Sequence, residues 1–318
     1  MIPLAEIERA RERIAGAAIR TPLVRLHVDS PAEIWLKLEN LQPIGAFKIR
    51  GATNAIRAAS PADLAGGVVT ASAGNMAQGV AWAAREAGVP ATIVVPDHAP
   101  QTKLDAIERL GGRIVKVPYD QWWQAIEESR FEGADGLFVH PVQDELVMAG
   151  NGTIGLELVE DLPNLDTVLI PFGGGGLSSG IASAVKQLRP DARVFACEPE
   201  TAAAVSAAFA AGGPAEVEYT PSFVDGAGAR KALPAMWPIV SEVIDGAHVA
   251  TLDETAAAIR LLAERVRVIA EGAGALAAAV AVSGRAGGGT IACIVSGGNI
   301  DVSTLTRILG GETPRSSQ

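Results

Sequence analysis

Short runs of β-branched residues alternate with helical stretches along most of this chain, and no other sequence feature constrains its fold as strongly. In a first series, the strand-like runs cover residues 67–72, 91–96 and 113–118, and each is followed by a helical stretch. In a second series, they cover residues 167–172, 193–199 and 291–296. Parallel strands need long crossover connections, which are usually helices. The alternation therefore predicts an α/β fold with mostly parallel, twisted sheets flanked by helices.

The first series lies between two parts of the second, and this order predicts two domains. We expect a small inserted α/β domain over residues 61–144, and a larger domain over residues 1–60 and 145–318. In open parallel sheets, ligands bind beyond the carboxyl ends of the strands. The turns that follow the strands are therefore the first places to look for a functional site.

Several local features carry their own expectations. Residues 47–59 are predicted to form a helix, and the alternating run around Leu36 a half-exposed strand. The glycine-rich stretch 149–153 is expected to precede a helix, and Asp253 to cap the helix that follows it. The last residues, TPRSSQ, are expected to form a loose tail.

Composition and charge argue against several classes of protein. The net charge of −10 and the absence of a basic run disfavour nucleic-acid binding. The N-terminus lacks the layout of a signal peptide, and the uncharged apolar run 273–282 is too short to span a bilayer. Cys197 and Cys293 each lie inside an apolar run, so we expect reduced core residues. These features favour a cytoplasmic enzyme.

Four consecutive glycines follow the strand-like run 167–172 and precede a helix: Gly173, Gly174, Gly175 and Gly176. Without side chains, the backbone can wrap closely around a ligand, and the helix start offers free N–H groups and a positive dipole end. This arrangement favours binding of a phosphate dianion. No Lys-Ser or Lys-Thr pair follows, which argues against a nucleoside-triphosphate loop. A dinucleotide site and a tight turn without ligand are the alternatives.

Lys48 lies near the start of the predicted helix 47–59. The same helix face carries only small apolar side chains, namely Ala52, Ala55 and Ala59. Another face, expected to contact water, carries Arg50, Asn54 and Arg57. Burial lowers the pKa of a lysine, as a nucleophilic amine that forms a Schiff base requires. A lysine at a helix start also commonly extends its ammonium group into solvent, and the motif alone fits both interpretations.

Two further turns carry polar groups between a strand and the next segment. The turn from Ser72 to Asn75 offers a hydroxyl, an amide and backbone donors, which suit a carboxylate or a ring hydroxyl. The turn from Ser296 to Asn299 follows the last strand-like run. Each of them alone could equally be an ordinary turn without a ligand.

Taken together, four segments resemble the serine/threonine dehydratase and serine racemase family, the fold-type II pyridoxal-phosphate enzymes of the tryptophan synthase β superfamily. KLENLQPIGAFKIRGA resembles the family's lysine motif, SAGNMAQGVA its asparagine loop, FGGGGL its phosphate loop, and VSGGN its contact to the pyridine nitrogen. Their order and spacing match from about Thr21 to Thr306. The resemblance implies a fold-type II enzyme with pyridoxal 5'-phosphate as cofactor and a homodimer as its assembly.

The resemblance also implies a role for each motif residue. Lys48 would hold the cofactor covalently and later move the Cα proton, and Phe47 would pack near the ring. The residues implied to hold the cofactor phosphate are Gly173, Gly174, Gly175, Gly176 and the amide of Leu177. Asn75 would bond the ring hydroxyl, Ser296 would face the pyridine nitrogen, and Glu271 would lie near the ring. The positions implied to contact the substrate are Ser72, which would bind its carboxylate, Ala73, Asn75 and Met76.

A serine opposite the ring nitrogen has a chemical consequence. A hydroxyl cannot keep that nitrogen protonated as a carboxylate would, so the ring is a weaker electron sink. This favours β-elimination over transamination. The resemblance therefore implies dehydration and deamination of L-threonine, L-serine or a related β-hydroxy amino acid to a 2-oxo acid and ammonia, with the cofactor phosphate protonating the leaving hydroxyl.

Particular positions narrow what the resemblance implies. Ala73 stands where racemases of the family carry serine, so racemisation is expected to be negligible. Met76 stands where histidine is usual; the more apolar pocket favours a bulkier β-substituent, as in threonine or a 3-aryl serine. Glu198 matches a cation-binding glutamate, but Ala204 stands where an aspartate ligand is expected. A divalent metal is therefore doubtful, and a monovalent ion held partly by carbonyls is the alternative.

Other functions fit the same motifs. Within the fold, a β-replacement enzyme or a threonine synthase relative is the alternative, and a serine racemase is less favoured. A nicotinamide-binding oxidoreductase and a cofactor-binding protein without turnover are alternatives of other classes. Because the chain stops soon after VSGGN, feedback control by an end-product amino acid is not expected.

Overall fold

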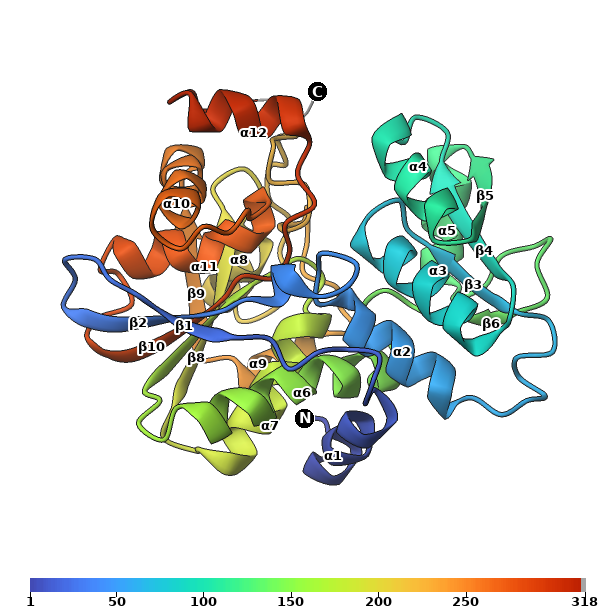
Figure 1. The fold of residues 1–318 in the computed structure, drawn as a ribbon, viewed down its shortest axis with the longest axis horizontal. Coiled ribbons are helices and arrows are strands. Elements are labelled where there is room, and N and C mark those ends of the chain that lie inside the picture. Colours follow the sequence, from blue (N-terminus) through green and yellow to red (C-terminus); the bar gives the residue numbers. More distant parts are fainter. Residues whose placement is uncertain (316–318) are drawn as a thin grey trace.

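The computed structural model describes residues 1–315, so residues 316–318 of the expected tail lie outside the described residues. Two separate sheets form the framework of the molecule (Figure 1). The six-stranded sheet has the order β1-β2-β10-β7-β8-β9, and the four-stranded sheet the order β5-β4-β3-β6. Every pair of neighbouring strands is parallel except β1 with β2, which confirms the predicted mostly parallel α/β fold.

The strands predicted from the apolar runs lie close to their predicted positions, whereas the strands at residues 23–26, 137–138 and 246–250 were not predicted. The strands of the larger sheet are β1 (Leu23–Leu26), β2 (Ala32–Lys37), β7 (Thr167–Pro171), β8 (Arg193–Pro199), β9 (Gly246–Ala250) and β10 (Gly289–Ile294). Those of the smaller sheet are β3 (Val68–Ala71), β4 (Ala91–Pro96), β5 (Gly112–Val117) and β6 (Leu137–Phe138). The helices are α1 (Leu4–Arg13), α2 (Lys48–Ala58), α3 (Asn75–Ala87), α4 (Gln101–Arg109), α5 (Tyr119–Glu127), α6 (Glu145–Asp161), α7 (Gly176–Leu188), α8 (Ala204–Ala211), α9 (Trp237–Val243), α10 (Leu252–Arg265), α11 (Gly272–Val282) and α12 (Val302–Leu309), with a short 3-10 helix at Glu39–Leu41.

The larger sheet is buried on both faces, which explains why its central strands are apolar throughout. Along β7, Val168 and Ile170 point into the core formed with α1, α6, α7 and α9. Leu169, between them, points into the opposite core, formed with α10, α11 and α12. This alternation follows from the two-residue period of a strand. Figure 1 shows α6 and α7 on one side of the sheet and α10 and α11 on the other.

The smaller sheet lies in a second lobe with α3, α4 and α5 (Figure 1). Helix α2 joins the two lobes, because its residues Ala52, Ala55 and Ile56 are buried in the core beneath the smaller sheet. The helix also packs against α6 of the larger lobe. Because α2 packs against both lobes, its contacts do not place a domain boundary at residue 61. The division into a domain of residues 61–144 and a domain of residues 1–60 and 145–318 stays a prediction. We call the regions around the two sheets the large-sheet lobe and the small-sheet lobe.

The prediction that Arg50 and Asn54 face water is wrong. Arg50 is 1% exposed, and its guanidinium nitrogens lie 2.8 Å from Glu39 Oε1 and 2.6 Å from Glu157 Oε1. Burial raises the pKa of the Glu39 carboxyl, but the Arg50 charge, the hydrogen bonds from Arg50 and Thr21 and the Lys37 charge together outweigh burial and hold that pKa below its usual range. Asn54 is buried and donates from Nδ2 to the Leu146 carbonyl. Only Arg57 of the three is exposed.

Lys37 corrects the expectation of a half-exposed strand around Leu36. Strand β2 lies inside the larger sheet, between β1 and β10. Lys37 is fully buried, donates to the Thr21 carbonyl at 2.8 Å and pairs with Glu157. A charged residue at an alternating position thus belongs to the interior, where a matched anion offsets its desolvation.

Two further local predictions are wrong. The glycine-rich stretch 149–153 does not precede a helix but lies within α6. A Cβ at Gly152 would lie 2.9 Å from the Gly180 carbonyl of α7, so the glycine permits close helix packing. Helix α10 is capped by Thr251, which forms a capping box with Glu254, and not by Asp253.

Cys197 and Cys293 are buried free thiols, as predicted. Within residues 1–315, none of the helices combines the length and apolar character needed to cross a membrane.

Candidate active site

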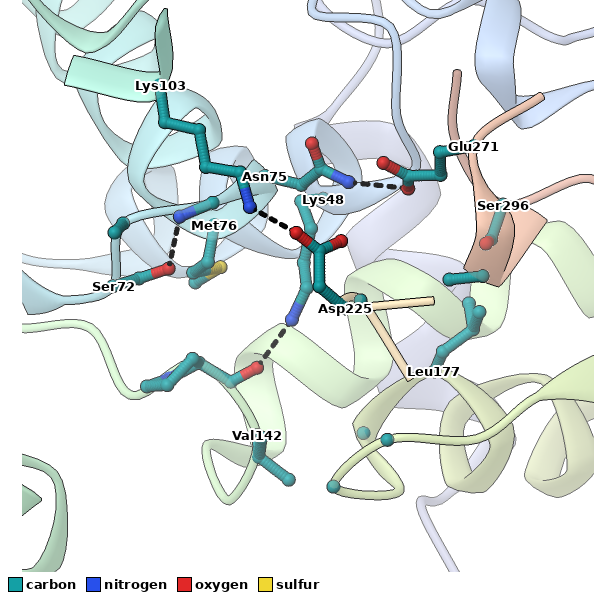
Figure 2. A pocket seen from close by; sticks show the side chains of 18 of the residues that line it. Lys48, Ser72, Asn75, Met76, Lys103, Val142, Leu177, Asp225, Glu271 and Ser296 are labelled. Atoms are coloured by element: carbon teal, nitrogen blue, oxygen red, sulfur yellow. Dashed lines mark hydrogen bonds and ion pairs between the residues drawn. The ribbon is translucent and has the colours of Figure 1, made fainter. Parts of the chain in front are cut away.

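A cavity of about 400 Å³ lies where the two lobes meet, at the carboxyl ends of strands from both sheets. Ser72 follows β3, Gly173 follows β7 and Ser296 follows β10. The structure brings together here every site residue that the sequence predicted except Glu198: Phe47, Lys48, Ser72, Ala73, Asn75, Met76, Gly173, Gly174, Gly175, Gly176, Leu177, Glu271 and Ser296. Figure 2 shows how the labelled side chains face one another.

The glycine loop between β7 and α7 forms one wall of the cavity. Gly175 is the N-cap of α7 and has a φ of 98°, a backbone conformation that residues with a side chain rarely adopt. A Cβ at Gly174 would lie 2.6 Å from Val142 Cγ2, and a Cβ at Gly176 would lie 2.8 Å from the Val142 carbonyl oxygen. The loop therefore needs glycine both for its turn and for its close contact with Val142. Its backbone and the start of α7 form a cradle suited to a phosphate.

Lys48 is the first residue of α2, and its amine points into the cavity. Nζ donates a hydrogen bond to the Pro141 carbonyl at 2.8 Å and lies 5.2 Å from the centre of the Phe47 ring. Burial lowers the pKa of Lys48 to about 8. The alternative of a lysine extended into solvent is thereby excluded, because the amine points into the cavity. With this pKa the ammonium form still predominates at physiological pH, but a larger fraction of the amine is neutral than in an exposed lysine.

Asn75 is held in a chain of side-chain amides and a carboxyl group. Its Nδ2 donates to Glu271 Oε1 at 2.8 Å, and its Oδ1 accepts from Asn299 Nδ2 at 2.7 Å. Asn299 also donates to the Ile44 carbonyl at 2.9 Å, on the segment that leads to Lys48. Burial, with a smaller contribution from the Asp225 charge, raises the pKa of Glu271 to about 8. Glu271 is therefore mostly protonated at neutral pH.

The turn at the start of α3 presents polar groups to the cavity. Ser72 Oγ accepts a hydrogen bond from the Gly74 N–H at 3.2 Å. A Cβ at Gly74 would meet no atom within 4 Å, so the backbone here is open to the cavity. Met76 is 2% exposed and belongs both to the cavity wall and to the core of the small-sheet lobe. The turn can thus bind an anionic group next to an apolar wall.

Ser296 closes the cavity from the large-sheet lobe. It follows β10, is buried, and its carbonyl accepts a hydrogen bond from the Phe47 N–H at 3.0 Å. This bond ties the last strand of the larger sheet to the start of α2. The turn with Ser296 and the amine of Lys48 are therefore placed by the same backbone contact.

Glu198 lies outside the cavity. Its carboxylate accepts hydrogen bonds from the N–H groups of Val205 and Ser206, both at 2.8 Å, and from Ser206 Oγ at 2.9 Å. Burial raises its pKa, against the effect of these hydrogen bonds. Within residues 1–315, no three His, Cys, Asp or Glu side chains form a group that could hold a metal ion. A cation at Glu198 stays a prediction.

Several residues of the site were missed by the sequence reasoning. They are His98, Lys103, Tyr119, Trp122, Pro141, Val142 and Asp225, which line the cavity. His98, Tyr119 and Trp122 form a row of adjacent rings, with centroid separations of 6.1 Å and 5.5 Å. For Pro141, the sequence offers one signal, the dipeptide His140-Pro141, which marks a break before a predicted helix.

Comparisons with known proteins agree with this geometry. The sequence matches the family "Pyridoxal-phosphate dependent enzyme" over residues 14–297. The L-threonine ammonia-lyase of Thermotoga maritima is 40% identical over 315 residues, covering 97% of this chain and 78% of that protein. Maize serine racemase superposes with a TM-score of 0.85 at 33% identity, covering 97% of both chains. Processed threonine deaminase isoform 2 from Solanum lycopersicum superposes with a TM-score of 0.86 at 32% identity, covering 96% of this chain and 93% of that chain.

These structural matches confirm the expected fold-type II architecture. The family match covers most of the chain, and it includes the glycine loop, the lysine and the asparagine turn that meet at the cavity. This chain therefore belongs to the family of pyridoxal-phosphate dependent enzymes.

Proposed function

We propose that this chain is a pyridoxal-phosphate dependent ammonia-lyase that acts on L-threonine, L-serine or a related β-hydroxy amino acid. One observation carries the proposal: the enclosed Lys48 amine, whose pKa is lowered to about 8, shares a cavity with a glycine loop suited to a phosphate. The L-threonine ammonia-lyase of Thermotoga maritima, 40% identical, supports the same reaction class.

The residues of the cavity fit the cofactor. The glycine loop and the start of α7 would hold its phosphate, Asn75 its ring hydroxyl, and Lys48 its aldehyde carbon. Bound in this way, pyridoxal phosphate supplies an electron sink that makes the Cα proton of an amino acid acidic. Ser296 would face the ring nitrogen; its hydroxyl cannot hold a proton there as a carboxylate would, which supports elimination over transamination.

The same residues can direct a β-elimination. Ser72 and the open backbone at Gly74 would bind the substrate carboxylate, which fixes the Cα–H bond relative to Lys48. The Lys48 amine, with a pKa near neutrality, can accept the Cα proton. Loss of this proton and of the β-hydroxyl removes water, and hydrolysis then gives a 2-oxo acid and ammonia.

The cavity wall supports a preference for a bulkier β-substituent than that of serine. Met76 places an apolar side chain beside the turn that would bind the carboxylate. The rings of Tyr119 and Trp122 line the same cavity and offer further apolar area. Ala73, without a hydroxyl, supports negligible racemisation. The proposal also includes a cytoplasmic location, which the net charge and the buried thiols support, and a homodimer, which the family resemblance supports. It further includes a small domain of residues 61–144 and a large domain of residues 1–60 and 145–318.

Reduction with borohydride, followed by peptide mass spectrometry, tests the cofactor assignment. We expect the pyridoxyl group on Lys48. A panel of hydroxy amino acids, assayed for ammonia and 2-oxo acid without a second nucleophile, tests the reaction. Activity that needs an added nucleophile would indicate β-replacement, and a coloured but inactive protein a binding function. A colourless protein that forms no adduct at Lys48 and binds a nicotinamide dinucleotide would contradict the proposal and indicate an oxidoreductase.

A further inference from the structure

The turn from His140 to Gln143, which we call the 140–143 turn, connects β6 to α6 and is held by one buried side chain. His140 is 4% exposed. Its Nδ1 accepts hydrogen bonds from the N–H groups of Val142 at 3.0 Å and Gln143 at 2.8 Å. Because Nδ1 accepts both, the ring proton of the neutral imidazole lies on Nε2. Burial, and then the nearby Lys48 charge, lower the pKa of His140 to about 4, so the ring is neutral at physiological pH.

The 140–143 turn touches both halves of the proposed cofactor site. On one side, the Pro141 carbonyl accepts the hydrogen bond from Lys48 Nζ at 2.8 Å (Figure 2). On the other, Val142 lies so close to the glycine loop that a Cβ at Gly174 would approach it to 2.6 Å. The distance between amine and phosphate cradle therefore depends on the conformation of this turn.

We propose that His140 is a positioning residue, which holds the 140–143 turn so that the Pro141 carbonyl docks the free Lys48 amine and Val142 supports the glycine loop. The proposal rests on the proposed function. A carbonyl that accepts one N–H of a neutral amine leaves the nitrogen lone pair free for bond formation or proton transfer. The turn thus orients the amine before the cofactor binds, and again each time the substrate releases it.

Asparagine and phenylalanine at position 140 separate this role from simple packing. An asparagine side-chain oxygen can accept N–H groups two and three residues further along the chain, as Nδ1 of His140 does. A phenylalanine fills the volume of the ring but accepts no hydrogen bond. If the hydrogen bonds matter, His140→Asn retains what His140→Phe loses. His248→Phe makes the same change at a partly buried histidine of β9, outside the cavity, and is the matched control.

The first experiment compares these variants with the wild-type chain by kcat, KM and thermal midpoint, and by the rate at which added pyridoxal phosphate attaches to cofactor-free protein. We expect His140→Phe to lose about 100-fold in kcat and to attach the cofactor slowly, since small misplacements of a reacting group have effects of this size. We expect His140→Asn to recover most of both rates, and His248→Phe to resemble the wild type. Equal impairment of Asn and Phe variants, or none in either, overturns the proposal.

The second experiment keeps the proposal falsifiable if His140→Phe does not fold. Val142→Ala removes the side-chain contact with Gly174 and leaves His140 in place. We expect slower attachment of pyridoxal phosphate but an unchanged rate with pyridoxal, which has no phosphate. Equal effects on both aldehydes, or no effect on either, contradict the proposed support of the glycine loop. Failure of the proposed function differs from all these outcomes, because the wild-type chain itself would then lack an adduct at Lys48.

Discussion

Lys103 of α4, in the small-sheet lobe, forms an ion pair with Asp225 of the large-sheet lobe across the cavity (Figure 2). A second contact joins the lobes beside it, since Thr102 Oγ1 donates to Asp301 Oδ1 at 3.0 Å. Both side chains of the ion pair line the cavity and are partly exposed. The start of α4 therefore bridges the two lobes beside the cavity.

Removing this ion pair is expected to change substrate capture more than stability. A partly exposed pair contributes about 1 kcal/mol or less to folding and is screened by salt. We expect Lys103→Met to change kcat/KM severalfold and to abolish most of its dependence on ionic strength, with an unchanged thermal midpoint. Asp225→Asn should have the same effect on kcat/KM and on its dependence on ionic strength. The double variant should differ little from either single variant, because each single change already removes the ion pair. Additive effects of the two changes would show that the residues act independently.

Lys48→Ala is expected to abolish covalent cofactor attachment and to lower kcat by at least about 10²- to 10⁴-fold, because the amine is both the attachment point and the proposed base. The visible spectrum and the ammonia assay measure the two effects. Lys48→Arg retains the positive charge but cannot supply a neutral amine, so it should be equally inactive. Lys116→Ala, on an exposed position of β5, is the control. Substantial activity in Lys48→Arg would exclude the proposed chemistry of this residue.

The sequence predicted most of the strands and helices and the turns at the cavity that follow β3, β7 and β10, because these depend on local patterns. Apolar β-branched runs mark buried parallel strands, and glycine or small polar residues mark the turns at their ends. The carboxyl ends of the strands meet at one place in such a fold, so turns far apart in sequence could be assigned to one site. Gly173 and Ser72 are examples of this success.

Long-range contacts could not be predicted in the same way. Arg50 occupies a polar position of the helical pattern, and its burial depends on pairing with Glu39, on a separate element, and with Glu157, which is distant in sequence. Lys103 has the appearance of any lysine on an amphipathic helix until the lobes meet at Asp225. No local pattern distinguishes such residues from solvent-exposed ones.

Met76→His is expected to shift the substrate preference toward serine. The apolar wall beside Ser72 would become polar, and the apolar contact with a larger β-substituent would be lost. A methylene in an apolar pocket contributes about 1–3 kcal/mol to discrimination, so the ratio of kcat/KM for threonine over serine should fall about tenfold or more. Met76→Leu retains the apolar wall and should retain the ratio. If Met76→His left the ratio of kcat/KM for threonine over serine unchanged, Met76 would not determine the preference for the β-substituent.

Ala73→Ser is expected to introduce racemisation that the wild-type chain lacks. Ala73 lines the cavity within the turn that would bind the substrate carboxylate, and a hydroxyl there could serve as a second proton donor for Cα. Chiral chromatography of the serine left after partial turnover measures the D-isomer. Ala73→Gly, which adds no hydroxyl, is the control. Comparable D-serine and pyruvate formation by the wild-type chain would contradict the proposed role of Ala73.

Glu271→Gln is expected to make the cofactor-free protein relatively more stable as the pH rises. The pKa of Glu271 is raised to about 8 by burial and by the Asp225 charge, whereas the same group in the unfolded chain titrates near 4.5. Between these values the folded protein holds a proton that the unfolded chain releases, so stability falls with rising pH, by at most about 1.4 kcal/mol per pH unit.

Glutamine still accepts the hydrogen bond from Asn75 but does not titrate. Urea unfolding at pH 5, about 6.5 and 8 should therefore show a growing advantage of the variant, whereas Glu8→Gln on the exposed face of α1 should show none. Parallel stability curves for Glu271→Gln and the wild type would mean that this carboxyl group is ionised in the folded protein.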